Sequence, residues 1–211
     1  MNQELIDKYI QLRRSNAPQI DPQKTALVII DMQEYQIRKE WALYKAVNNF
    51  VPGLLDYFVA QVNDVVEPNI IRLIGAFREN GLKIVYTKFS SFSKDGGDLA
   101  PGLKRMNNLT KNAYGEPSFP YFDHPASEIV QSLKPEDNDL IIVKNTSSAF
   151  ASTNLDDILK NMGIEHLIVA GVVTNMCIEG TARIGSELGF YVKIVEDACT
   201  AWTPEIHNVL D

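Results

Sequence analysis

The amino-acid sequence predicts a single three-layer α/β/α domain built on a mainly parallel sheet. Three observations support this prediction. Short runs of apolar and β-branched residues recur along the chain, and segments with helical spacing separate them. The length of 211 residues suits one domain, or one domain with a small appendage. Because parallel strands need long crossover connections, which helices normally supply, the alternation favours helices on both faces of the sheet.

Five segments are predicted as strands. Thr25–Asp31 (TALVIID) is continuous in apolar residues, as a strand buried on both faces requires. Four further segments of this kind leave room for a helix between them: Lys83–Thr87, Asp139–Lys144, Glu165–Val173 and Tyr191–Glu196.

Helices are predicted between these strands. One begins at Pro68 and ends before Gly81, because proline is favoured in the first turn of a helix and glycine just past the last. The others are expected from Ser152 or Thr153 to Gly163, over Asn175–Leu188, and after Thr203, a capping residue followed by Pro204.

Three stretches depart from the alternation. Residues 1–21 form an N-terminal extension with a modest amphipathic pattern, suited to docking or oligomerisation. Residues 35–67 carry apolar side chains at helical spacing and are interpreted as an inserted helical pair, broken near Val51-Pro52-Gly53; their apolar side chains would pack either on the domain's own core or on a neighbouring subunit. Residues 90–121 are predicted as a long loop, of the kind that serves as a lid or binding loop.

The composition excludes several classes of protein. Acidic residues exceed basic ones, giving a net charge of −7, which disfavours binding to nucleic acid or to anionic lipid. Two cysteines are too few for a secreted disulfide scaffold, and Cys199 is expected to be a packed thiol. No apolar run approaches the roughly 20 residues that cross a bilayer, and the first residues lack a secretory signal. We therefore expect a cytoplasmic protein.

Three reactive side chains follow the predicted strands. Asp31 ends the first, Lys144 ends the third, and Cys177 lies in the first turn of the helix after the fourth. Ligands of open parallel sheets bind outside the carboxyl ends of the strands, so these side chains should meet there. Singly, each has a structural interpretation: a packed thiol, a solvated lysine, a turn aspartate. Together they favour catalysis.

The three groups suit acyl transfer to water through a thioester-type intermediate. Only the thiolate is a good nucleophile, and both a helix N-terminus and a nearby lysine favour it. The carboxylate can accept the thiol proton and later protonate a departing amine. Backbone N–H groups in the turn Gly171–Cys177 could stabilise an oxyanion.

Three segments, TALVIIDMQ, LIIVKNTSSAFASTNL and LIVAGVVTNMCIEGTARIGSELGFYVKIVEDACTAW, resemble the isochorismatase-like cysteine hydrolases from about Pro22 to His207. The resemblance implies that family's Rossmann-like fold and a catalytic triad of Asp31, Lys144 and Cys177. It also implies a cis peptide bond between Val172 and Val173, and an oxyanion hole formed by the backbone N–H groups of Val173 and Cys177.

The nicotinamidase branch of this family carries a metal site of one Asp and two His after the second strand. Here that region reads YTKFSSFSKDGGDLA and contains no histidine, and His124, His166 and His207 show no ligand spacing. We therefore expect no metal and no other cofactor.

True isochorismatases cleave a vinyl ether and commonly lack the cysteine, so Cys177 favours C–N cleavage instead. The resemblance then points to amidohydrolases of small amide, ureido or carbamoyl compounds, such as N-carbamoylsarcosine, ureidoacrylate and biuret hydrolases, and to a homo-oligomer (dimer or tetramer). Two alternatives stay open: a vinyl-ether hydrolase using Asp31 as general acid, and a non-catalytic binding protein. Substrate-binding candidates, ranked by closeness to the triad in sequence, are Gln33, Trp41, Phe89, Phe92, Asn145 and Thr174.

Overall fold

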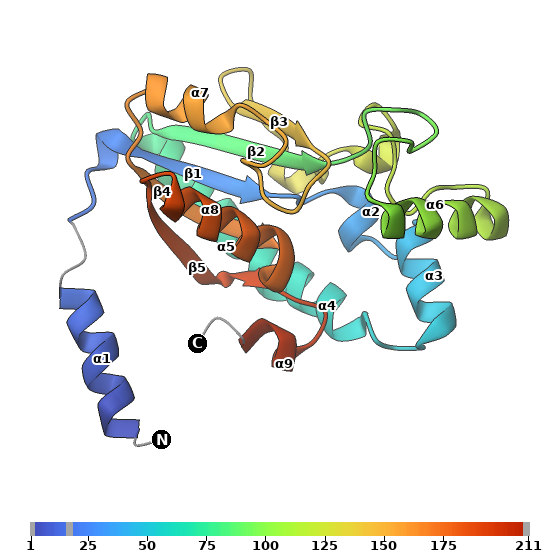
Figure 1. Ribbon diagram of the computed structural model, residues 1–211, viewed down its shortest axis with the longest axis horizontal. Coiled ribbons are helices and arrows are strands. Elements are labelled where there is room, and N and C mark those ends of the chain that lie inside the picture. Colours follow the sequence, from blue (N-terminus) through green and yellow to red (C-terminus); the bar gives the residue numbers. More distant parts are fainter. Residues whose placement is uncertain (1–2, 16–18, 209–211) are drawn as a thin grey trace.

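The computed structural model describes residues 3–15 and 19–208. Its core is a five-stranded parallel sheet in the order β3-β2-β1-β4-β5 (Figure 1). The central strand β1 is buried at all six positions, as its continuous apolar sequence predicts. The strands are β1 Thr25–Ile30, β2 Lys83–Phe89, β3 Leu140–Lys144, β4 His166–Val172 and β5 Tyr191–Thr200.

Helices cover both faces of this sheet, which confirms the three-layer α/β/α prediction. On one face Leu27 and Ile29 of β1 pack with helix α5. On the other face Ala26, Val28 and Ile30 pack with α7 and with the turn before α8. The helices are α1 Gln3–Ser15, α2 Glu34–Ile37, α3 Ala42–Phe50, α4 Asp56–Gln61, α5 Glu67–Glu79, α6 Pro101–Tyr114, α7 Leu155–Asn161, α8 Glu179–Glu187 and α9 Pro204–His207.

The stretch predicted as an inserted helical pair is joined to the crossover helix. The break between α3 and α4 falls at residues 51–55, as expected, but α4 continues through a π-helical turn, Val62–Val66, directly into α5. Pro68 has no N–H to donate to residue 64, which accounts for a widened turn just before it. The second half of the stretch is therefore the first part of the crossover between β1 and β2.

Most of the apolar side chains of this stretch pack on the domain's own core. Leu55 and Phe58 are buried, and Trp41 and Leu54 pack against the same cluster. Phe50 and Val51 are exceptions, with 74% and 50% of their surfaces exposed. The expected homo-oligomer stays a prediction.

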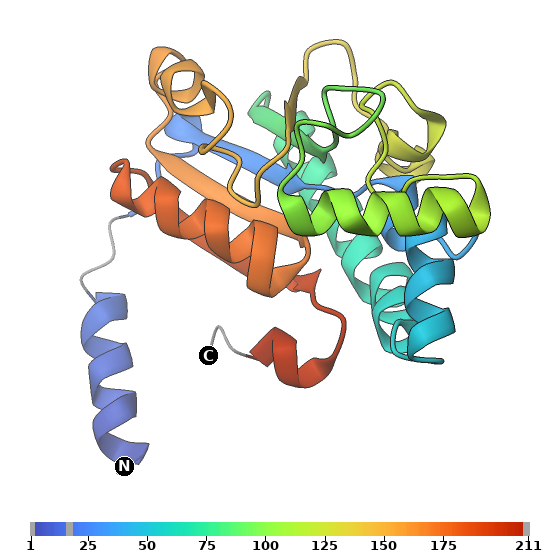
Figure 2. The same ribbon diagram turned by 45° about the vertical axis from the view of Figure 1, so that its right-hand side comes forward.

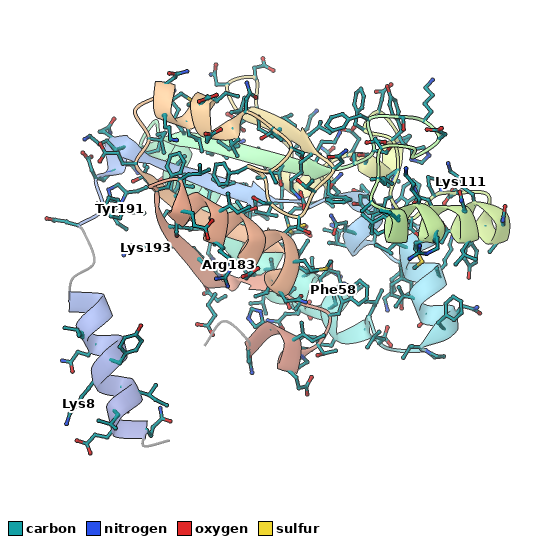
Figure 3. All side chains as sticks on the ribbon, viewed as in Figure 1. Lys8, Phe58, Lys111, Arg183, Tyr191 and Lys193 are labelled. Atoms are coloured by element: carbon teal, nitrogen blue, oxygen red, sulfur yellow. The ribbon has the colours of Figure 1, made fainter. Side chains whose placement is uncertain are left out.

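The predicted long loop 90–121 contains a helix of 14 residues, α6, so that part of the prediction was wrong. Pro101 lies in its first turn and Gly115 ends it with a left-handed backbone (φ +75°). Asn107 fixes the helix to the returning chain, because its side chain bonds both the N–H and the carbonyl of Phe119 at 2.7 and 2.9 Å. Lys111, labelled in Figure 3, donates to the backbone oxygen of Asp95 at 3.2 Å.

Two peripheral elements complete the described chain. Helix α1 lies apart from the three layers (Figures 1 and 2), and α6 lies beyond the carboxyl ends of β1 and β2, beside α3. Within the described residues, we find no helix that is both long enough and apolar enough to span a bilayer.

Candidate active site

Three strand ends bring Asp31, Lys144 and Cys177 together, as the sequence predicts. Asp31 follows β1, Lys144 closes β3, and Cys177 lies in a π-helical turn, Thr174–Ile178, between β4 and α8. The Nζ atom of Lys144 is 2.6 Å from Oδ2 of Asp31 and 3.3 Å from Sγ of Cys177. The ammonium therefore bridges the carboxylate and the thiol.

The order of strands explains why a lysine makes this bridge. Strand β3 is two positions away from β1 in the sheet, roughly 10 Å at the usual strand spacing. Only a long side chain spans that gap. The intervening strand β2 contributes Thr87, whose hydroxyl donates to Oδ1 of Asp31 at 2.6 Å. Each oxygen of the Asp31 carboxylate thus has a partner of its own.

All three groups are deeply buried, but not equally. Asp31 and Lys144 have no exposed surface, whereas Cys177 keeps 8%. Lys144 also donates to the backbone oxygen of Thr146 at 3.1 Å and lies 4.8 Å from the centre of the Phe89 ring. The thiol is the member of the three that a ligand can reach.

Burial and charge set the protonation of the site. Burial raises the pKa of the Cys177 thiol far above its usual range, the charge of Asp31 adds to this, and Lys144 only partly offsets it. For Lys144, burial lowers the pKa, but Asp31 and Cys177 outweigh it, so the net shift is upward and the amine stays charged. The resting thiol is therefore protonated: Lys144 favours the thiolate, as expected, but burial and Asp31 outweigh this effect.

The turn before Cys177 has the expected backbone. The peptide bond between Val172 and Val173 is cis. Just before it, Gly171 has φ +121°, and a Cβ at this position would lie 2.2 Å from the backbone oxygen of Ile30. Only glycine lets β4 approach the central strand so closely. This contact fixes the turn against the end of β1, next to Asp31.

A cavity of about 500 Å³ opens beside the thiol. Val173 and Cys177 form part of its wall, and the remaining wall comes from segments far apart in sequence. Its volume falls within the range of small-molecule sites. The other lining residues are Tyr35, Gln36, Leu43, Phe89, Ala100, Leu103, Met106, Phe119, Asn145, Thr146, Ser147, Met176 and Trp202.

Of the six predicted substrate-binding residues, Phe89 and Asn145 line this cavity. Phe89 is held there by Gln33, whose Oε1 accepts from the Phe89 N–H at 2.7 Å. Gln33 itself is fully buried and does not line the cavity; its Nε2 donates to the backbone oxygen of Ser127 at 2.9 Å. It is a structural residue behind the wall.

Trp41, Phe92 and Thr174 also lie outside the set of lining residues, which corrects their prediction. Trp41 packs edge-on against His124, with ring centres 6.0 Å apart. Phe92 is 46% exposed. The Thr174 hydroxyl is hydrogen-bonded to Nδ1 of His207 at 2.8 Å. For these three residues, closeness in sequence to Asp31, Lys144 or Cys177 did not give a place on the wall.

Sequence reasoning missed the residues that α6 brings to the cavity. Leu103 and Met106 line it from α6, and Phe119 from the chain that returns after this helix. A sequence signal for this helix was present, because Pro101 and Gly115 lie where the helix begins and ends. Trp202 lines the cavity from the segment after β5 and left no comparable signal.

Asn145 is held by an exposed aspartate. Its Nδ2 donates to Oδ2 of Asp98 at 3.0 Å, and the same carboxylate accepts from the Phe92 N–H at 2.9 Å and from the Ser93 hydroxyl at 2.7 Å. Burial acts to raise the pKa of Asp98, but these hydrogen bonds and one from Ser91 together outweigh it and hold the pKa well below its usual range. A permanent negative charge therefore lies next to Asn145.

In the described ranges, no three His, Cys, Asp or Glu side chains gather as a metal site would require. The histidines have other contacts. His124 accepts from the N–H of Ala126 at 3.1 Å, and His166 stacks on Tyr191. The second thiol, Cys199, is buried at the end of β5, and burial raises its pKa to about 12.

Comparisons with known proteins agree with this fold. The chain is 29% identical over 203 residues to the ureidoacrylate amidohydrolase RutB of Acinetobacter baylyi, covering 91% of this chain and 77% of the relative. The crystal structure of a cysteine hydrolase from Pseudomonas syringae pv. phaseolicola superposes with a TM-score of 0.68 at 29% identity, over 86% of this chain and 75% of that one. An N-carbamoylsarcosine amidase from Thermoplasma acidophilum superposes with a TM-score of 0.59 at 25% identity, over 87% and 88%.

The family model for the isochorismatase domain matches residues 25–209, which include the whole sheet and all three residues of the bridged site. This chain belongs to the isochorismatase family of hydrolases.

Proposed function

We propose that this chain is a cysteine amidohydrolase that cleaves a C–N bond of an amide, ureido or carbamoyl compound without a metal. The observation that carries the proposal is the bridge that Lys144 makes between Asp31 and Cys177 at the wall of the cavity. The amide chemistry in the names of RutB and the N-carbamoylsarcosine amidase supports the same reaction class.

In the first half-reaction, Sγ of Cys177 attacks the carbonyl carbon of the amide. The thiol proton passes to Asp31 as the C–S bond forms, since the raised thiol pKa leaves little free thiolate. The backbone N–H groups of Val173 and Cys177 stabilise the oxyanion. Asp31 then gives its proton to the nitrogen, the C–N bond breaks, and ammonia or an amine leaves a thioester on Cys177.

In the second half-reaction, water attacks the thioester carbon. Asp31 accepts a proton from the water, the C–S bond breaks, and the proton returns to the sulfur to regenerate the thiol. The products are the acid and the free enzyme. Throughout, Lys144 remains charged and stabilises whichever of Asp31 and Cys177 carries the negative charge.

Ammonia release from a panel of amides tests this proposal. The panel holds biuret, ureidoacrylate, N-carbamoylsarcosine, nicotinamide, maleamate and hexanamide, assayed on chelator-treated protein. We expect release from at least one compound by the parent protein and by Cys199→Ala, which removes the other buried thiol, and none by Cys177→Ala.

Two outcomes would contradict the proposal. Ammonia release that persists in Cys177→Ala would show that the thiol is not the nucleophile. Cleavage of isochorismate by Cys177→Ala, with no amide turned over by the parent protein, would favour the vinyl-ether reaction.

A further inference from the structure

The cavity beside Cys177 has an uncharged wall. None of the described residues that line it has an ionised side chain. Most of the wall is apolar, with Leu103 and Met106 from α6 and with Phe119, Met176 and Trp202 from three other segments. Its polar groups are neutral amides and hydroxyls, such as those of Asn145 and Ser147.

The one ammonium beside the thiol is already engaged. Lys144 has no exposed surface, and its Nζ donates to Asp31, to Cys177 and to the backbone oxygen of Thr146. An ammonium has three protons to donate, and these contacts use them all. A substrate carboxylate in the cavity would therefore find no cationic partner on the described part of the wall.

An ionised group directly contacts one polar residue of the wall, and this group is an anion. Asp98 accepts a hydrogen bond from Asn145, which itself lines the cavity. The whole chain also carries a net charge of −7. A substrate carboxylate would lose its water and face like charge, and burying an unpaired charge is strongly unfavourable.

We infer that the substrate is an uncharged amide with an apolar acyl group, and that amides bearing a carboxylate are excluded. This inference rests on the proposed amide hydrolysis and narrows its substrate class. It sets this chain apart from hydrolases of carbamoyl or ureido acids, whose substrates carry a carboxylate by definition.

Three matched compounds test the inference: hexanamide, 5-carboxypentanamide, and the methyl ester of 5-carboxypentanamide. The second places a carboxylate at the end of the chain, and the third removes its charge again. We expect kcat/KM for amide hydrolysis to be at least about 100-fold lower for the carboxylate than for hexanamide. For the methyl ester, kcat/KM for amide hydrolysis should return most of the way to the value for hexanamide.

Substitutions on α6 test whether a cation on the wall reverses this preference, and one of them serves as the matched control. Met106→Arg and, as a second variant, Leu103→Lys place a cation on the wall and should raise kcat/KM for 5-carboxypentanamide about tenfold while lowering it for hexanamide. Leu109→Arg adds the same charge at an outward position of α6, where Leu109 is 58% exposed. This variant should leave the ratio of kcat/KM for 5-carboxypentanamide to that for hexanamide unchanged.

The outcomes separate this inference from the proposed function. Hydrolysis of 5-carboxypentanamide as fast as hexanamide would overturn the inference and leave amide hydrolysis standing. If no amide is hydrolysed, calorimetric binding to the Cys177→Ala protein decides: tighter binding of hexanamide supports the neutral site although the proposed reaction has failed. Equal or tighter binding of the carboxylate overturns the inference.

Discussion

The end of the sheet and the wall of the cavity are built in different ways. At the end of the sheet, Asp31 follows β1, Lys144 is the last residue of β3, and Cys177 lies in the turn after β4; the register of the parallel strands brings them together. The wall includes Phe89 and residues of the sheet-end turns, but much of it comes from α2, α3, α6, the chain after α6 and the segment after β5. The first region is charged and hydrogen-bonded, whereas the second is mostly apolar and holds no ion among its described residues.

The difference separates two tasks within one site. Strand ends are fixed by the hydrogen bonds of the sheet, so they hold reacting groups in a constant geometry. The wall is carried by connecting segments, which can change length and side chains without disturbing the sheet. We therefore expect substitutions at the sheet end to change kcat, and substitutions on the wall to change KM.

The largest effect is expected from Asp31→Asn. The amide keeps the shape of the carboxylate but cannot accept the thiol proton, so kcat should fall roughly 10²–10⁴-fold with KM little changed. Asp139→Asn is the matched control at the opposite end of the sheet, where Asp139 bonds Arg78. Its kcat in the same steady-state assay should match that of the parent protein. An equal loss of kcat in both variants would contradict the account.

Lys144→Met should lower stability as well as rate. It leaves the Asp31 carboxylate buried without its cation, which costs about 3–5 kcal/mol in the free energy of unfolding. Lys88→Met is the comparison, because its partner Glu128 keeps 62% of its side chain exposed and stays hydrated. We expect a smaller loss there, about 1–2 kcal/mol, because the substitution also removes the donor to the backbone oxygen of Phe122 at 3.1 Å. Urea denaturation measures the free energy of unfolding of both variants. Similar losses would show that the Lys144 bridge stabilises the fold no more than the Lys88 ion pair does.

The protonated thiol predicts a particular pH profile of alkylation. Because burial and Asp31 raise the pKa of Cys177, the thiolate fraction should keep growing as the pH rises. The rate of iodoacetamide labelling at Cys177, followed by peptide mass spectrometry, should increase through pH 9 without a plateau. Cys177→Ala gives the background from other sites. A plateau below pH 7 would instead indicate a stable thiolate and contradict the account.

The smallest effect is expected on the wall. Leu103→Ala removes apolar contact from the substrate side of α6 and should raise KM several-fold, with kcat nearly unchanged. Leu109→Ala truncates a leucine on the exposed side of the same helix and should change neither constant. A fall in kcat without a change in KM for Leu103→Ala would mean that the wall takes part in positioning the reacting groups.

The contrast between the sheet end and the cavity wall also explains which site residues could be predicted from the sequence. Asp31, Lys144 and Cys177 could be identified because each follows a strand with a clear apolar signature, and parallel strands end at one edge. Helix α6 was missed because its sequence is polar and lies among glycines and prolines that indicate loops, although Pro101 and Gly115 mark its ends. The predicted Trp41 and Thr174 packed elsewhere, since their partners His124 and His207 come from distant segments.

The charge state of the Cys177 thiol could not be predicted from the sequence for a related reason. A helix start and a lysine favour the thiolate, but depth of burial decides the balance, and burial depends on how the whole domain packs. The extent of the apolar wall likewise depends on Trp202 and Phe119, which reach the cavity through the tertiary fold.

Partitioning of the acyl group between water and hydroxylamine tests the central claim most directly. If Cys177 forms a thioester, hexanamide and methyl hexanoate give the same acyl-enzyme. The account predicts that, in fixed hydroxylamine, both substrates yield the same ratio of hydroxamate to acid, and that Cys177→Ala yields neither product. Ratios that depend on the leaving group, or product formed by Cys177→Ala, would contradict it.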